Sequence, residues 1–309
     1  MIGLVYIVIG LAMLFIGGEA LVRGAVALAV KLNIPKIVIG LTIVALGTSA
    51  PEIVVAVQSA IKGYSDIAVG TVLGSNIANI LLVLGFTALI CPVTVGPDIR
   101  KIDAPFLLFI TCACAFFAYF GGFSWREGLI FIALLVGYFI SLFFMGRSES
   151  VDEDIPDDPD TEPFKMIFAL VLGIFLLAVG SEILVRGAVI IAELFGISQG
   201  VIAATVVAIG SSSPEIITCV IAAKRNQVEF ILGNVIGSNI LNILAGLGAA
   251  TMVTWIHVAD SFLRFEIWFM VAVTLLFVWI IKTRPQFNKI HAWFFLALYA
   301  GFIIKQVVV

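Results

Sequence analysis

Side chains that bind soft metals or form disulfides are scarce in this sequence. There are two histidines, His257 and His291, and they lie far apart in the chain. The four cysteines lie in or beside long apolar segments and show no pairing pattern (Cys91, Cys112, Cys114 and Cys219). These absences argue against a zinc site, an intramembrane metalloprotease and a disulfide framework. We therefore interpret the cysteines as small packing residues.

Charge is also scarce. Charged residues make up 12% of the chain, hydrophobic residues make up 62%, and the mean hydropathy is +1.20. This composition excludes a soluble domain and indicates an all-α integral membrane protein. We predict ten transmembrane helices, at about residues 2–28, 36–61, 66–91, 103–121, 126–145, 165–192, 199–223, 229–254, 264–282 and 288–306. The first is too long for a cleavable signal peptide and has no basic start.

One polar segment divides the chain. Residues 147–163 hold 8 of the 20 acidic residues and three prolines. We interpret this segment as a solvated, disordered linker. A regulatory calcium-binding loop is the alternative, although the Asp-x-Asp-x-Asp-Gly spacing of such loops is missing. The predicted organisation is a first five-helix repeat over 1–146, the linker over 147–163 and a second five-helix repeat over 164–309.

The two halves contain near copies of the same segments, all related by one constant offset along the chain. VALGTSAPEI around Glu52 matches VAIGSSSPEI around Glu215, and GSNIANIL at 74–81 matches GSNILNIL at 237–244. Over residues 37–60, 12 of 24 positions are identical to their partners, and over 70–85, 11 of 16 are. Each copy places one glutamate in the middle of a span. A charged group at that depth is costly and usually functional, and a duplicated one predicts an ion or substrate site between repeats.

The distribution of Lys and Arg predicts the orientation. Eleven basic residues fall in the loops on the side of the linker and five on the other side. The positive-inside rule then places the linker in the cytoplasm and both termini outside the cell membrane. Each half has five spans, an odd number, so the two halves are expected to be inverted about an axis in the membrane plane.

The first copy has the composition of a broken helix. Pro51 has no N–H, so the carbonyl of Gly47 loses its helical partner. Thr48 and Ser49 are placed to cap a helix that restarts near Pro51. Thr48 and Ser49 also precede Glu52 by four and three residues, so the three side chains can share one face. We therefore predict a break at mid-membrane whose oxygens face a cavity.

The second copy repeats these features with Gly210, Ser211, Ser212, Pro214 and Glu215. In each half the next span adds a serine and an asparagine four residues apart, namely Ser75 and Asn79, and Ser238 and Asn242. All the ligand atoms on offer are hard oxygens. Such oxygens suit Ca²⁺, which takes 6–8 of them in flexible geometry, better than Mg²⁺ or soft metals.

Charge balance points to exchange. Glu52 and Glu215 are the only acids well inside predicted spans, and no basic residue lies at the same depth. Two ionised carboxylates alone would be destabilising there. One Ca²⁺ neutralises them, and so do two protons or two or more monovalent cations. A site that cannot stay empty but can be filled in several ways suits an exchanger.

Other polar and small residues are expected to have structural roles. Gly40, Gly70, Gly74, Gly233 and Gly237 are predicted to pack helices closely. Asn76 and Asn239 are expected to form hydrogen bonds between helices. Glu19–Arg23 and Glu182–Arg186 are spaced for ion pairs within one helix.

These residues also carry a family signature. GTSAPE (47–52) and GSSSPE (210–215), each followed by a GSNIxN motif (74–79 and 237–242), closely resemble the α-repeats of sodium/calcium exchangers of the cation/Ca²⁺ exchanger superfamily. The resemblance covers the whole chain, and it is to the compact prokaryotic form because the large regulatory loop of animal exchangers is missing. It implies exchange of several Na⁺ for one Ca²⁺ by alternating access.

The resemblance also implies a role for each site residue. Glu52 and Glu215 would bridge Ca²⁺ and also serve Na⁺, together with the backbone carbonyls of Thr48 and Ser211 on Ca²⁺. Na⁺ would take the carbonyls of Ala45 and Ala208 and the hydroxyls of Thr48, Ser49, Ser75, Ser211, Ser212 and Ser238, with Asn79 and Asn242 at the centre. Many relatives, including potassium-dependent exchangers, have Asp in place of Asn242, so Asn242 looks like the potassium-independent type.

Two other functions remain open at this point. A proton-coupled cation exchanger of the same superfamily is one, although its Gly-Asn-x-x-Glu type repeat is absent. A cation channel is the other, because a channel also uses mid-membrane oxygens. We expect no enzyme activity, no cofactor, no nucleic-acid partner and no obligatory protein partner. The expected partners are Ca²⁺, Na⁺ and the lipid bilayer.

Overall fold

The computed structural model describes residues 2–144, 163–196 and 208–308. The first half contains α1 (Ile2–Leu32), α2 (Lys36–Ile39), η1 (Gly40–Val44), α3 (Ala45–Ile61), α4 (Ser65–Ala78), η2 (Asn79–Val83), α5 (Leu84–Ile90), β1 (Val93–Thr94), η3 (Ile99–Asp103), α6 (Ala104–Tyr119) and α7 (Trp125–Phe144). The second half contains α8 (Pro163–Leu194), α10 (Ala208–Ser211), α11 (Ser213–Lys224), α12 (Val228–Leu241), η5 (Asn242–Leu247), α13 (Gly248–Val253), α14 (Asp260–Arg264), α15 (Glu266–Thr283), β2 (Gln286–Phe287) and α16 (Lys289–Val308). The η segments are π-helical turns within longer helices.

The chain is a multi-pass membrane protein. Nine helices within the described ranges are long and apolar enough to cross a bilayer, and they correspond to nine of the ten predicted spans. The remaining predicted span, 199–223, lies partly outside the described residues. Its described part forms α10 and α11. The linker predicted over 147–163 also lies outside them, except for Pro163, which begins α8.

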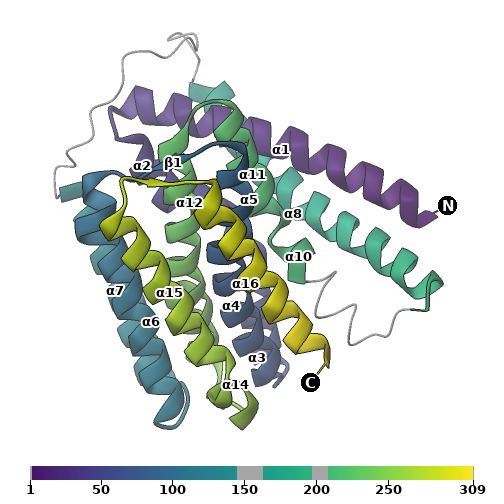
Figure 1. Cartoon of the computed structure of the whole chain (residues 1–309), viewed down its shortest axis with the longest axis vertical. Helices are drawn as coiled ribbons and strands as arrows, with labels where there is room; N and C mark the ends of the chain where they lie inside the picture. Colours follow the sequence, from purple (N-terminus) through teal and green to yellow (C-terminus); the bar gives the residue numbers. More distant parts are fainter. Residues whose placement is uncertain (1, 145–162, 197–207, 309) are drawn as a thin grey trace.

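The two longest helices, α1 and α8, form a pair that runs at a steep angle to most of the other helices (Figure 1). A helix of 31 residues is about 46 Å long, more than the roughly 30 Å hydrocarbon layer, so a tilt of this pair is expected. Glycines recur every seventh residue along the contact, at 3, 10, 17 and 24 in α1 and at 173, 180 and 187 in α8. A Cβ atom at Gly10 would lie 2.7 Å from the backbone nitrogen of Leu184. The two backbones therefore touch along a seam that only glycine permits.

The other helices surround α12, which is buried on all sides. Its neighbours include η1, α3, α11 and η5. At one end of the bundle β1 pairs antiparallel with β2, with Val93 opposite Phe287, and β1 lies against α12. At the opposite end an isolated bridge joins Phe123 to Ile256. We call these ends the β-pair side and the opposite side.

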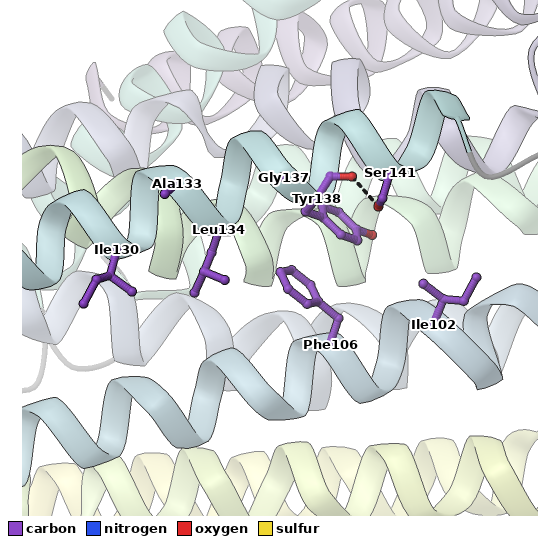
Figure 2. A pocket seen from close by; sticks show the side chains of 8 residues that line it. All are labelled: Ile102, Phe106, Ile130, Ala133, Leu134, Gly137, Tyr138 and Ser141. Carbon is purple, nitrogen blue, oxygen red and sulfur yellow. Dashed lines mark hydrogen bonds between the residues drawn. The ribbon is translucent and has the colours of Figure 1, made fainter.

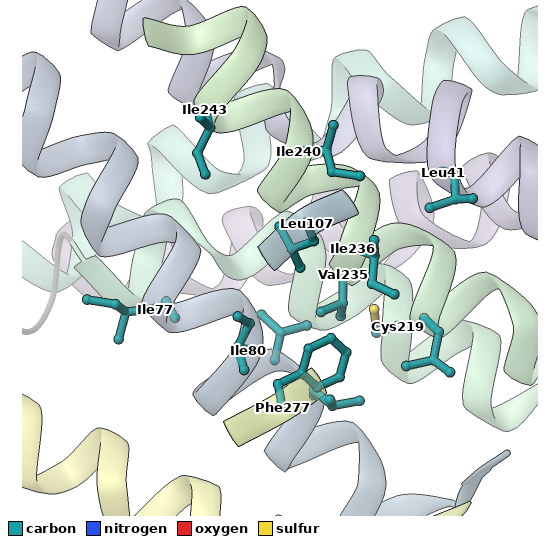
Figure 3. Packing of buried hydrophobic residues seen from close by; sticks show 14 of the residues in the cluster. Leu41, Ile77, Ile80, Leu107, Cys219, Val235, Ile236, Ile240, Ile243 and Phe277 are labelled. Atoms are coloured by element: carbon teal, nitrogen blue, oxygen red, sulfur yellow. The ribbon is translucent and has the colours of Figure 1, made fainter. Parts of the chain in front are cut away.

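Large apolar side chains fill the space around α12 (Figure 3). Phe277 of α15, Leu107 of α6 and Ile80 of η2 meet Val235 and Ile236 of α12, and all five are buried. Helices with apolar side chains on every face form the interior of a bundle, whereas lipid covers the outer helices. The predicted site residues Ser238 and Asn242 lie on this buried helix and on the turn that follows it.

The helix boundaries of the two halves coincide at the offset that relates Glu52 to Glu215. α4 covers 65–78 and α12 covers 228–241, and π-helical turns begin directly after them, at Asn79 and Asn242. α3 covers 45–61, and α10 with α11 covers 208–224. Positive φ angles follow at Gly63 and Asn226, which are also equivalent positions in the two halves. Near-identical sequences thus begin and end their helices at equivalent positions, although Ser212 interrupts the second helix.

A separate cavity of about 510 Å³ lies between α6 and α7 (Figure 2). Its lining is almost entirely apolar and includes Phe106, whose ring stacks on Tyr138 with 4.6 Å between centroids. The Tyr138 hydroxyl donates to Asp103 Oδ1 at 2.8 Å, and Asp103 is buried. The residues that line this cavity include no acidic side chain, so they do not offer a carboxylate to a cation.

Candidate cation site

The polar residues of the two sequence copies meet where α3, α4, α11 and α12 cross. Glu52 and Glu215 are 2% and 1% exposed, and they come from opposite halves of the chain. Seven further predicted residues are also buried, namely Ala45, Thr48, Ser49, Asn79, Ser212, Ser238 and Asn242. Ser75 is 5% exposed, Ser211 is partly exposed, and Ala208 begins α10. The predicted residues therefore converge on one buried region.

Hydrogen bonds join the two halves across this region. The Ser49 hydroxyl donates to Glu215 Oε1 at 3.2 Å. The Thr48 hydroxyl donates to Asn234 Oδ1 at 3.0 Å and lies 3.4 Å from the Ser238 hydroxyl. Thr48 Oγ1 is also 3.3 Å from the Ala45 carbonyl oxygen. Since a hydroxyl has one proton, the short Asn234 bond uses it, and the lone pairs of the Thr48 oxygen remain available.

Many oxygens of the region have no hydrogen-bond partner. Within the described part of the chain, six buried oxygens of the predicted residues are unpartnered: Glu52 Oε1 and Oε2, Glu215 Oε2, Asn79 Oδ1, Asn242 Oδ1 and Ser212 Oγ. Leaving one buried polar group unpaired costs about 1–3 kcal/mol, and more for a charged group. Such a concentration of unpaired oxygens is stable only with a cation or protons among them, because buried polar groups are otherwise satisfied.

Comparison with known proteins identifies the family. The family model described as sodium/calcium exchanger protein matches residues 2–145 and 165–308. The chain belongs to the sodium/calcium exchanger family. It is 31% identical to sodium/calcium exchanger MaX1 of Methanosarcina acetivorans, with 96% of each chain covered. It is 39% identical to the putative antiporter CaxA of Alkalimonas amylolytica, over 82% of this chain and 81% of that protein.

The fold of this exchanger is also that of a solved relative. A structure of the sodium-calcium exchanger NCX_Mj, soaked with Na⁺ and Sr²⁺, superposes with a TM-score of 0.85. The identity is 32%, and 98% of each chain is covered. The family and this structural likeness together support cation/Ca²⁺ antiport by a helical membrane protein.

The helix break predicted between Gly47 and Pro51 in the first copy is wrong. α3 continues through Pro51 from Ala45 to Ile61, and no side-chain hydrogen bond caps its start. Thr48 and Ser49 are therefore not caps, and their hydroxyls bond to groups of the second half instead. The irregular backbone lies about two turns earlier, in the π-helical turn η1. π-helical turns widen a helix and occur often at functional sites, and apolar sequence such as Gly40–Val44 gives no sign of one.

The second copy has the predicted break, at Ser212. This residue separates α10 from α11, and Pro214 follows in the first turn of α11. The carbonyl of Gly210, which Pro214 leaves without a helical donor, accepts hydrogen bonds from the hydroxyls of Ser181 and Ser213 at 2.7 and 2.6 Å. The first copy has Gly18 and Ala50 at the corresponding positions, without hydroxyls. The two copies are therefore not chemically equivalent.

Two structural expectations from the sequence are also corrected. The Nδ2 groups of Asn76 and Asn239 donate to the carbonyls of Val72 and Val235, each within its own helix rather than to a neighbouring helix. A Cβ atom at Gly74 would meet nothing within 4 Å, and one at Gly70 would meet only the Phe262 ring. In contrast, Gly40, Gly233 and Gly237 do pack against backbone atoms.

Gly70 and Gly74 line a cavity that leads to Glu52. This cavity has a volume of about 400 Å³ and also contains Thr71 and Ser75 of α4, Val55 of α3, and Glu182 and Val185 of α8. Its α4 residues run from near the turn at 61–65 toward the middle of the helix. The cavity therefore connects the buried carboxylate with the opposite side, as defined by the Phe123–Ile256 bridge.

Asn234 is a site residue that the sequence analysis missed. It is 1% exposed, accepts the Thr48 hydroxyl and donates through Nδ2 to Cys219 Sγ at 3.4 Å. The Cys219 contact sets the amide orientation that presents Oδ1 to Thr48. One signal was available, because the aligned residue Thr71 is also polar and both positions lie one turn before the Ser75 and Ser238 positions of the repeated motif.

We expect Asn234→Ala to lower the apparent cation affinity about ten-fold, the effect of losing one hydrogen bond of about 1.4 kcal/mol at a binding group. Thr48→Val should have a similar or larger effect. If Asn234 acts by orienting Thr48, the double variant should be no weaker than Thr48→Val alone, as a double-mutant cycle of ⁴⁵Ca²⁺ uptake against Ca²⁺ concentration would show. Asn239→Ala is the matched control, and additive losses would contradict this role.

Proposed function

We propose that this chain is a Na⁺/Ca²⁺ antiporter that exchanges three Na⁺ for one Ca²⁺ by alternating access. The observation that carries the proposal is the cluster of buried, unpartnered oxygens around Glu52 and Glu215, next to a cavity that Glu52 lines. Two carboxylates match one divalent ion in charge. Their low exposure and the neutral oxygens around them also allow several Na⁺ ions in separate positions.

The ligands are proposed as follows. Glu52 and Glu215 bridge Ca²⁺ and also bind Na⁺, since each has an oxygen without a hydrogen-bond partner in the described chain. Backbone carbonyls of Thr48 and Ser211 complete the Ca²⁺ shell, and those of Ala45 and Ala208 bind Na⁺. Hydroxyls of Thr48, Ser49, Ser75, Ser211, Ser212 and Ser238 supply the remaining Na⁺ ligands, with Asn79 and Asn242 at the centre. Hard oxygens of this kind suit both cations.

The alternation follows from the repeats. We propose that residues 1–146 and 164–309 are two inverted five-helix units. Their coinciding helix boundaries and the odd number of predicted spans per half support this organisation. In such an arrangement the two units exchange conformations, so the site opens to one side and then to the other.

The decisive experiment is ⁴⁵Ca²⁺ uptake into proteoliposomes loaded with Na⁺, with an H⁺ gradient, or with neither. Uptake that requires internal Na⁺ supports the proposal. Uptake driven by protons would indicate a Ca²⁺/H⁺ antiporter, and uptake that needs no counter-ion would indicate a channel. All three outcomes use the same buried oxygens, so only the counter-ion distinguishes them.

The potassium dependence is a separate prediction. Asn242 is neutral, so the site has two carboxylates rather than three and needs one fewer counter-charge. We expect exchange to proceed at an unchanged rate when K⁺ is replaced by a large organic cation. Asn242→Asp should alter the ion dependence of exchange, and Asn239→Asp serves as a control one turn away. An absolute K⁺ requirement in the natural chain would contradict this prediction.

The orientation in the plasma membrane can be tested by labelling. We propose that both termini are extracellular and that the linker at 147–163 is cytoplasmic, because eleven of the basic loop residues lie on the linker side. A single cysteine placed in the linker of a cysteine-free variant should be protected from an impermeant thiol reagent in intact cells. A cysteine at the C-terminus should react at once. The reverse pattern would invert the topology.

A further inference from the structure

An ion pair joins α1 to the end of α11. Arg225 follows the last residue of α11 and donates to the Glu19 carboxylate through two nitrogens, Nη2 to Oε1 and Nε to Oε2, the latter at 3.2 Å. Glu19 also pairs with Arg23 four residues along α1, at 2.9 Å. The Glu19 and Arg225 side chains are 38% and 28% exposed. This paired geometry is the strong form of an arginine–carboxylate contact and ties two separate elements together.

The same three positions recur in the second half without the cross-connection. In the alignment of the two halves, Glu182, Arg186 and Lys62 correspond to Glu19, Arg23 and Arg225. Glu182 pairs with Arg186 at 2.7 Å within α8, but the structure gives Lys62 no ion pair among the described residues. Glu182 instead lies at the mouth of the cavity that leads to Glu52. One of two equivalent ion pairs is formed, and the other is not.

Helix packing shows the same difference. α1 covers α11 so closely that a Cβ atom at Gly18 would lie 3.1 Å from Ile217 Cγ2 and 2.7 Å from Ile221 Cδ1. The corresponding residues of α3, Val54 and Gln58, are exposed, and Val54 is 51% exposed. The glycines of α12 pack against η1 and its neighbours, whereas the corresponding Gly70 and Gly74 line the cavity. The structure is therefore closed on the β-pair side, where Glu19 pairs with Arg225. It is open toward the opposite side, where Glu182 and Lys62 are not paired with each other.

A buried hydroxyl also fits this pattern. Thr218 Oγ1 of α11 is buried and has no hydrogen-bond partner in the described chain. The corresponding residue in α3 is Val55, which lines the open cavity. An unpaired hydroxyl in a packed core is unfavourable. Water could hydrogen-bond to the Thr218 hydroxyl if this face of α11 lines a water-filled passage in another state of the transport cycle.

We propose that Glu19–Arg225 and Glu182–Lys62 are two alternating ion-pair latches, of which one is closed in each end state of the transport cycle. In the present structure Arg225 holds α1 over α11 and closes the β-pair side. When α1 and α8 move, Glu19 separates from Arg225, α8 covers the exposed face of α3, and Glu182 meets Lys62 on the opposite side. This inference rests on the proposed alternating-access function and adds the residues that set the balance between its two states.

The chemical difference between the latches gives that balance a direction. Arginine binds a carboxylate through two parallel bonds, whereas lysine offers a single point charge. The Arg225 latch is therefore the stronger of the two, and the state open on the opposite side is the more populated state without ions. Partly exposed ion pairs contribute up to about 1 kcal/mol, which corresponds to a population ratio of about five-fold. Cation binding can readily overcome a bias of that size.

Disulfide trapping in a cysteine-free background tests the proposal. Gly18→Cys with Ile217→Cys reports the closed β-pair side, because a Cβ atom at Gly18 would lie 3.1 Å from Ile217 Cγ2. Ser181→Cys with Val54→Cys is the corresponding pair for the other state. Cross-linking rates are measured in membranes free of Na⁺ and Ca²⁺. We expect Arg225→Gln to slow the first pair and accelerate the second, so that the ratio of the two rates changes about five-fold, and Lys62→Gln to change that ratio in the opposite direction.

Arg23→Gln is the matched control, because Arg23 also pairs with Glu19 but lies on the same helix, so this pair does not connect α1 to α11. It should change neither rate, and the charge exchange Glu19→Arg with Arg225→Glu should restore the original ratio. Equal effects of Arg225→Gln and Arg23→Gln, or failure of the second pair to form in a chain that still exchanges Ca²⁺, would overturn the latches. These rates need no ion gradient. They remain informative if ⁴⁵Ca²⁺ uptake shows that the coupling ion is not Na⁺.

Discussion

Replacing either buried glutamate with glutamine is expected to abolish calcium exchange while the protein still folds. Glu52→Gln and Glu215→Gln each remove one of the two buried charges that balance a divalent ion. Removing one partner of a buried charge pair costs about 3–5 kcal/mol, so we expect at least about a 100-fold loss of Ca²⁺ exchange. The measurement is Na⁺-driven ⁴⁵Ca²⁺ uptake in proteoliposomes, together with size-exclusion profiles that show folded protein.

The control for this experiment is Asp66→Asn, the same carboxylate-to-amide change at an exposed position of α4. It should leave exchange near its original rate. Near-normal exchange by either glutamine variant would refute a shared site between the two halves. Glu52→Asp offers a finer test, because it keeps the charge and shortens the side chain by one methylene. We expect it to retain more exchange than Glu52→Gln.

Transport is expected to carry net charge across the membrane. Three Na⁺ against one Ca²⁺ moves one positive charge per cycle in the direction of Na⁺ movement. At about 100 mV that charge is worth about 2.3 kcal/mol. It corresponds to roughly a 40-fold larger achievable Ca²⁺ gradient, in addition to the contribution of the Na⁺ gradient. The expectation rests on two carboxylates surrounded by several neutral oxygens, which give room for more than two Na⁺ ions.

Proteoliposomes clamped with K⁺ and valinomycin measure this effect. An inside-positive potential should accelerate Ca²⁺ uptake coupled to Na⁺ efflux, and an inside-negative potential should slow it. Flux that does not respond to voltage would mean electroneutral exchange, with two Na⁺ or two H⁺ per Ca²⁺. The two intramembrane glutamates would then still bind the ions, but the third Na⁺ position would be wrong.

Much of the membrane organisation followed from the sequence because the physical constraint is strong. Backbone groups in lipid must bond within their own segment, so a long apolar run has few alternatives to a helix. Nine predicted spans correspond to described helices for this reason. The positions of Glu52 and Glu215 were equally predictable, since an acid at bilayer depth must lie inside the bundle.

The local backbone was predicted less well. Proline and serine suggested a break at Gly47 to Pro51, but α3 continues there and the irregular turn is η1. Proline removes one hydrogen bond, and neighbouring helices can compensate for that loss without ending the helix. π-helical turns such as those at Asn79 and Asn242 have no composition of their own. The sequence therefore located the polar residues but not the shape of the helices that hold them.

The sequence by itself determined the nine membrane-spanning helices of the described chain, the duplication and the types of side chain that lie near Glu52 and Glu215, because these depend on side-chain polarity and spacing along one chain. Only the tertiary structure decided which equivalent groups are in contact. Two copies of one motif have almost the same local preferences, yet Arg225 reaches Glu19 while Lys62 does not reach Glu182 in the structure. The same is true of Asn234, whose partner Thr48 is 186 residues away. Contacts between distant helices depend on how whole helices pack, and a pattern read along one segment carries no information about that packing.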